Sequence, residues 1–133
     1  GRRGPAATCV RWATSSSSGE VELFTAAVDG CMRRFEEGGA CLSRLCLRRA
    51  FEPVGIRSIV TDGAVVIGGC DDGSIRVWAA AAGDDDDDAQ EFFVKEDAHA
   101  DAVNCLFMAR NGRVLVSGGG DNCVRIWSIH PMG

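Results

Sequence analysis

Few side chains in this 133-residue chain could take part in acid, base or metal chemistry. Only two histidines are present, His99 and His130. A histidine that acts in catalysis needs a nucleophile or a carboxylate at the same site, and no such group recurs beside either of them in the sequence. We therefore expect His99 to have a structural role and His130 to be solvated, and we predict no enzymatic activity.

The cysteines do not form a metal-binding pattern. Seven are present, and Cys41 and Cys46 have no second Cys or His pair at zinc-finger spacing. An odd number scattered over expected strands favours reduced thiols, most of them small buried hydrophobic side chains. The sequence thus predicts no metal site.

Two glycine-rich segments, residues 68–74 and 117–122, could suggest a phosphate-binding loop. Neither matches GxxxxGK[ST] or GxGxxG, and both lie between expected strands rather than between a strand and a helix. Their glycines fit tight turns that need a positive φ. No cofactor is predicted.

The elements that hold these residues are clearest between Val103 and Ile129. Residues 103–108, 113–118 and 123–128 read as three short strands joined by turns, and apolar and polar side chains alternate in the third. Asn111-Gly112 is a strong hairpin signal, because both residues tolerate positive φ.

The same pattern occurs three times along the chain. Aligning Trp127 on Trp78 without gaps places Asp121 on Asp72, Ser117 on Gly68, Val103 on Val54 and His99 on Ala50. In the first copy, Phe35 takes the Trp place, Asp29 the Asp place and Thr25 the Ser place. Repeated sheet units of this kind stack on their neighbours to bury their faces. With one carboxylate per unit, the aspartates fit turn caps rather than an acid/base pair.

These units resemble WD repeats, the blades of a β-propeller. In the last unit the resemblance rests on Ala98-His99, Val103, Ser117, Asp121 and Ile126-Trp127-Ser128. It implies an all-β fold of four-stranded antiparallel sheets. It also implies a hydrogen-bonded set of His99, Ser117, Asp121 and Trp127, with partial sets of Asp72 and Trp78 in the middle unit and of Thr25 and Asp29 in the first. The family's opening Gly is Ala98 here, and its closing Asp is Ser128.

We expect a disordered N-terminus at residues 1–7, followed by a WD-repeat segment at 8–133. Its blades are predicted at about 8–48, 53–95 and 98–129, the last without an outer strand. The five aspartates at 84–88 repel one another and are expected in an exposed loop. Three blades leave a ring incomplete, since propellers have about 4 to 8. We therefore expect a fragment of a larger propeller, or a chain that pairs with a second copy or with another chain.

The resemblance implies a non-enzymatic scaffold that binds other proteins or peptides. The expected binding face includes Asp71, Asp72, Asp101 and Asn122, and its acidity suits a basic peptide. One alternative is a propeller segment of an enzyme whose active part lies elsewhere. Another is a nucleic-acid-binding complex that uses arginines such as Arg33, Arg44 and Arg57, which we interpret instead as solvent-facing on outer strands. Without an apolar run of about 18 residues, no membrane span is expected, and the predicted location is intracellular, in the cytoplasm or nucleus.

Overall fold

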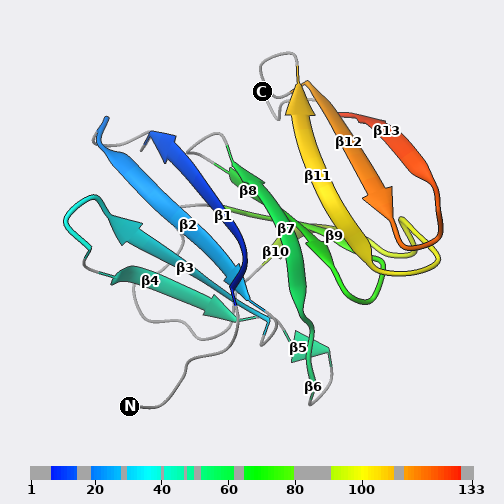
Figure 1. Cartoon of the computed structure of the whole chain (residues 1–133), viewed down its shortest axis with the longest axis horizontal. Coiled ribbons are helices and arrows are strands. Elements are labelled where there is room, and N and C mark those ends of the chain that lie inside the picture. Colours follow the sequence, from blue (N-terminus) through cyan, green and yellow to red (C-terminus); the bar gives the residue numbers. More distant parts are fainter. Residues whose placement is uncertain are drawn as a thin grey trace.

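The computed structural model describes residues 7–14, 19–27, 30–39, 41–46, 48–49, 52–61, 65–79, 91–109 and 113–129. The predictions for residues 1–6, Asp29, Ala50, the aspartates at 84–88 and His130 lie outside these ranges. Every regular element in the described part is a strand, so the all-β prediction is confirmed. Figure 1 shows the sheets arranged as a fan, with the first and last sheets at opposite ends.

Three antiparallel sheets, which we call the first, middle and last blades, follow one another along the chain. The first contains β1 (Ala7–Thr14), β2 (Val21–Ala27), β3 (Cys31–Glu36) and β4 (Cys41–Cys46), in that order. The middle blade contains β7 (Ile56–Thr61), β8 (Val65–Cys70), β9 (Ile75–Ala79) and β10 (Glu91–Lys95). The last contains β11 (Val103–Ala109), β12 (Val114–Gly119) and β13 (Val124–Ser128). A short hairpin of β5 (Arg48–Arg49) and β6 (Glu52–Pro53), which the sequence did not predict, joins the first two blades.

The middle blade is buried on both faces. Ile59, Val66 and Trp78 pack against the first blade, in a cluster with Phe24 and Met32. On the opposite face, Val60, Ile67 and Ile75 pack against Leu106 and Leu115 of the last blade. A strand covered on both sides needs apolar residues at every position, which explains the uninterrupted run VVIGGC in β8.

The first strands of the three blades lie side by side. β7 contacts both β1 and β11. The backbone N–H of Ile59 donates to Cys9 Sγ at 3.4 Å, and the N–H of Leu106 donates to Ser58 Oγ at 3.1 Å. These three strands therefore line a common centre, and the other strands of each blade extend outward from it.

A β-bulge recurs near the start of each first strand. The register shifts between Ala7 and Cys9, between Ile56 and Ser58, and between Val103 and Cys105. The bulge residues Thr8, Arg57 and Asn104 are therefore equivalent.

This register corrects the gapless alignment. Val103 lies opposite Gly119 and Ile56 lies opposite Cys70, so Val103 corresponds to Ile56 and not to Val54. The segment between the paired residues Met108 and Leu115 is two residues longer than that between their equivalents, Thr61 and Val66, and this shifts the whole first strand. The alignment of His99 on Ala50 carries the same error of two residues.

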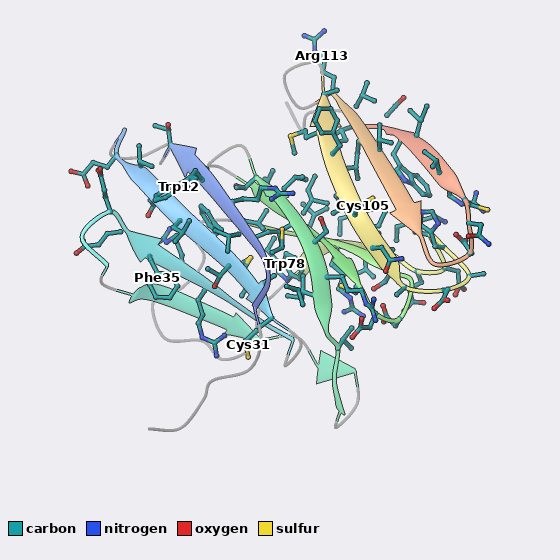
Figure 2. All side chains as sticks on the ribbon, in the orientation of Figure 1. Trp12, Cys31, Phe35, Trp78, Cys105 and Arg113 are labelled. Carbon is teal, nitrogen blue, oxygen red and sulfur yellow. The ribbon has the colours of Figure 1, made fainter. Side chains whose placement is uncertain are left out.

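The cysteines differ from the expectation of reduced, buried thiols. Cys31 is disulfide-bonded, so that prediction is wrong at this position, and Cys46 lies directly opposite it in the pairing of β3 with β4. Cys105 and Cys123 are free but exposed. Cys70 is free and buried, and burial raises the pKa of its thiol to about 12. Figure 2 labels Cys31 and Cys105 on the first and last blades.

Candidate functional site

In the last blade the structure brings His99, Ser117, Asp121 and Trp127 together. His99 Nδ1 lies 3.0 Å from Asp121 Oδ1, and His99 Nε2 lies 2.8 Å from Ser117 Oγ. The indole Nε1 of Trp127 donates to Ser117 Oγ at 2.9 Å. Because a carboxylate only accepts, His99 Nδ1 carries the proton of its bond to Asp121, while His99 Nε2 lies within hydrogen-bonding distance of the Ser117 hydroxyl.

Asp121 fixes the backbone around this set. Its carboxylate accepts from the backbone N–H of Ala100 at 2.9 Å and from that of Cys123 at 3.1 Å. The Ala100 bond, together with His99 and Cys123, lowers the pKa of Asp121 to about 2, although desolvation opposes the shift. One side chain thereby joins the loop that enters β11 to the turn between β12 and β13.

The order Asp–His–Ser resembles a nucleophilic triad, but its surroundings differ from those of a catalytic serine. Ser117 is 0% exposed, and its oxygen already accepts from Trp127 while its hydroxyl lies against His99. A substrate could not reach this oxygen without opening the blade. The set is therefore suited to holding the blade together rather than to acyl transfer.

In the middle blade the equivalent turn is held differently. Asp72 Oδ1 accepts from the N–H of Ser74 at 3.0 Å, and Arg76 Nη2 lies 3.2 Å from Asp72 Oδ2. Arg76 Nε also donates to Ser74 Oγ at 3.0 Å. Burial alone would raise the pKa of Asp72, but the hydrogen bonds from Ser74 and the charge of Arg76 outweigh it and lower the pKa.

The predicted partners Asp72 and Trp78 do not meet in a shared set. Trp78 is buried in the middle of the molecule (Figure 2), and its Nε1 has no hydrogen-bond partner among the described residues. Gly68 stands where the last blade has Ser117, and a Cβ there would lie 2.8 Å from the Trp78 ring. The ring occupies the space that a hydroxyl would need. Thr25, the remaining predicted residue in the described part, is half-buried in β2 opposite Val10 and Arg33.

The turns of neighbouring blades are joined into one continuous edge. The N–H of His99 donates to the carbonyl of Gly73 at 3.1 Å, and the N–H of Gly120 donates to that of Ala102 at 2.8 Å. Gly73 has φ +84, and a Cβ there would lie 2.3 Å from the His99 carbonyl oxygen, so only glycine fits. The segments 71–73, 98–102 and 119–122 therefore present a fixed surface.

Next to Asp71 of this surface lies an open cavity of about 510 Å³, lined by Thr8, Ile56, Arg57, Asp71 and Asn104. Arg57 Nε contacts Asp71 Oδ1, and Arg57 Nη1 donates to Asn104 Oδ1 at 3.2 Å. The hydrogen bond and charge of Asp71, aided by Asp101, raise the pKa of Arg57. We call these residues the central mouth.

Sequence reasoning missed the central mouth. Arg57 was interpreted as an outer-strand arginine, but it lies in β7, the innermost strand of its blade. The signal that could have found it is the bulge, which aligns Arg57 with Thr8 and Asn104. The misaligned first strand concealed that relation.

The described residues offer no alternative chemical site. Among them, no three His, Cys, Asp or Glu side chains lie close enough together to hold a metal ion. The same residues include no helix with the length and apolarity that a bilayer crossing requires.

Comparison with known proteins agrees with this architecture. The WD domain, G-beta repeat family matches residues 46–79 and 91–128, more than half of the chain. No curated protein matches. A chain from a humanized mutant of the Chaetomium thermophilum Polycomb Repressive Complex 2, bound to the inhibitor GSK126, superposes with a TM-score of 0.77 at 18% identity. The superposition covers 98% of the present chain but only 28% of that chain, so the likeness is one of fold. The sheets, their stacking and the matched repeats together show that this chain belongs to the WD40-repeat family.

Proposed function

We propose that this chain is a non-enzymatic interaction segment of a larger propeller assembly, which binds a protein or peptide at the central mouth and the turns around it. The observation that carries the proposal is the fixed edge made by segments 71–73, 98–102 and 119–122. Its backbone groups are bonded within and between blades, so exposed side chains on it are held in place before a partner arrives.

The charges around the mouth favour a basic partner. Asp71 and Asp101 are exposed there and face a single arginine, Arg57. Asn122, at φ 64, adds an exposed amide on the neighbouring turn. Asp72 is the least exposed of the four candidate residues and also holds Arg76. A lysine or arginine side chain could share the mouth with Arg57 or replace it on Asp71, because exposed ion pairs exchange at little cost.

Two considerations support a binding role over catalysis. WD40 repeats generally serve as interaction domains, and the one Asp–His–Ser arrangement in the described residues is buried inside its blade. We also infer an intracellular location, in the cytoplasm or nucleus. The disulfide of Cys31 stands against this inference, so alkylation of Cys31 in a native extract tests it: a reduced thiol would support the intracellular location, and an intact bond would contradict it.

The proposal is tested by reversing charge at the mouth. In the double variant Asp71→Lys/Asp101→Lys, binding of a fluorescent nonapeptide of alternating arginine and alanine should weaken by about tenfold, measured by anisotropy. Glu37→Lys is the control, since Glu37 is exposed in the turn after β3, away from the mouth.

Equal binding by the wild type and the double variant would contradict the proposed face. Retention of single-stranded DNA that falls steeply with added salt would favour the nucleic-acid alternative.

A further inference from the structure

The bulge of the middle blade brings a long charged side chain to the central mouth. The bulges of the first and last blades contribute the shorter, uncharged Thr8 and Asn104, whereas that of the middle blade contributes Arg57. A bulge interrupts the alternation of a strand and can turn a side chain away from both faces of the sheet. Arg57 thereby reaches Asp71 of its own blade and Asn104 of the next one.

These contacts hold the Arg57 guanidinium as the mouth would hold a basic side chain of a partner. Its Nε contacts Asp71 Oδ1, and its Nη1 donates to Asn104 Oδ1 at 3.2 Å. Asp71 is fixed in place because its backbone N–H donates to the carbonyl of Gly55 at 2.8 Å. Asp101 acts on the same guanidinium, since its charge contributes to the raised pKa of Arg57. The carboxylate best placed for a basic partner is therefore already engaged by the chain itself.

The contact between Arg57 and Asp71 is open to exchange. The two side chains are 50% and 42% exposed, and Asn104 is exposed as well. Ion pairs in such surroundings contribute little free energy, because water and salt screen them. The neighbouring turn is held by Asp72 and Arg76 instead, so Arg57 can leave Asp71 without opening the blade.

We propose that Arg57 is a built-in competitor at the central mouth, which occupies Asp71 until a basic side chain of the partner displaces it. The inference rests on the proposed function and deepens it, because it assigns a residue that regulates the same face. A site that is free for only part of the time binds with an affinity reduced by that fraction. Arg57 thus sets the affinity of the mouth, and it favours partners whose basic group replaces its own contact with Asp71.

The test is the binding of the nonapeptide of alternating arginine and alanine to Arg57→Ala, measured by anisotropy. We expect binding about fivefold tighter than that of the wild type, because Asp71 is then free in every molecule. Arg113→Ala is the matched control. It removes an equal charge from an exposed position at the other end of the last blade (Figure 2), beyond the end of β11 that is remote from Asn104, and should change binding by less than about twofold.

Loss of a positive charge near the mouth would also tighten binding by reducing repulsion, and a second background separates the two causes. In Asp71→Asn the group that Arg57 occupies is no longer a carboxylate, so adding Arg57→Ala should tighten binding by less than about twofold. A gain of equal size in both backgrounds would show repulsion alone and would overturn the inference. Weaker binding by Arg57→Ala would overturn it too, because Arg57 would then be a contact of the partner.

The outcomes distinguish this inference from the proposed function. Suppose that the wild type binds the peptide more tightly than Asp71→Lys/Asp101→Lys does, while Arg57→Ala binds it as the wild type does. That result would keep the binding face and remove the competitor. Peptide binding by neither the wild type nor Arg57→Ala would remove both.

Discussion

The middle and last blades use the same turn aspartate with different partners. In the last blade, Asp121 contacts the imidazole ring of His99, and the chain of hydrogen bonds continues through Ser117 to Trp127. In the middle blade, Asp72 meets the guanidinium of Arg76, and the bonds end at Ser74. The indole of Trp78 is buried and that of Trp127 is partly buried, and among the described residues only the Trp127 N–H has an acceptor.

The comparison shows which part of the repeat is essential to the blade. A carboxylate that accepts a backbone N–H closes the turn in both blades. Hydrogen bonds lower both pKa values, mainly that of the Ser74 hydroxyl for Asp72 and that of the Ala100 N–H for Asp121. The side chain that bonds to this carboxylate can be an imidazole, as in His99, or a guanidinium, as in Arg76. Ser117 fits in the last blade, where it accepts a hydrogen bond from Trp127. In the middle blade the Trp78 ring fills the space that a side chain at Gly68 would need.

Removing the turn carboxylates, Asp72 and Asp121, should have the largest effect on the free energy of unfolding. Asp72→Ala takes a carboxylate away from Arg76, whose side chain is 9% exposed, and should lower the free energy of unfolding by about 3 kcal/mol. Asp121→Ala should cost less, because the imidazole of His99 can lose its proton when the carboxylate is removed, whereas the guanidinium of Arg76 stays charged. Urea titrations of both variants measure the order, and a greater loss for Asp121→Ala would contradict the difference between the blades.

A serine placed at Gly68, the position equivalent to Ser117, tests whether the middle blade can form the hydrogen bond of the last blade. Gly68→Ser supplies the hydroxyl that the middle blade lacks, yet its Cβ would lie 2.8 Å from the Trp78 ring. We expect a loss of about 1–3 kcal/mol from overpacking rather than a gain from a new hydrogen bond. Ser128→Gly, at an exposed position in β13, is the control for inserting or deleting a side chain in a strand. A stabilised Gly68→Ser protein would show that the two blades are interchangeable.

Low pH should have the smallest effect on stability, through the protonation of Asp121. The folded pKa of Asp121 is about 2, below its ordinary value of 3.8, so its contribution is present above pH 3.8. That contribution is lost as the pH falls from 3.8 through 2. Asp121→Asn should therefore flatten the fall in stability over this interval, as measured by urea midpoints at successive pH values. A slope identical to that of the wild type would mean that Asp121 is not stabilised by folding.

Much of the architecture could be predicted from local pattern. The alternation in β13, the Asp-to-aromatic spacing and the aspartates at each turn predict the sheets, because a strand shows its two faces with a period of two. The outer strand β10 follows from its apolar run EFFVK alone.

What the pattern concealed depends on small changes of register and on contacts across blades. The bulges at Thr8, Arg57 and Asn104 add a residue that no periodicity marks, so the central mouth was missed. The role of Arg76 could not be predicted either, because an arginine four residues after an aspartate is usually solvent-facing. Its burial and its bonds to Asp72 and Ser74 exist only in the folded blade.

The most direct test of the account is a double-mutant cycle on the last blade, with the middle blade as its reference. Ser117→Ala and Trp127→Phe should show a coupling energy of about 1 kcal/mol, since each removes the same hydrogen bond. Ser117→Ala and Trp78→Phe should be additive, because Trp78 Nε1 donates to no group in the part of the chain that the structure describes. Equal coupling in the two cycles, or none in either, would contradict the conclusion that the blades are held by different chemistry.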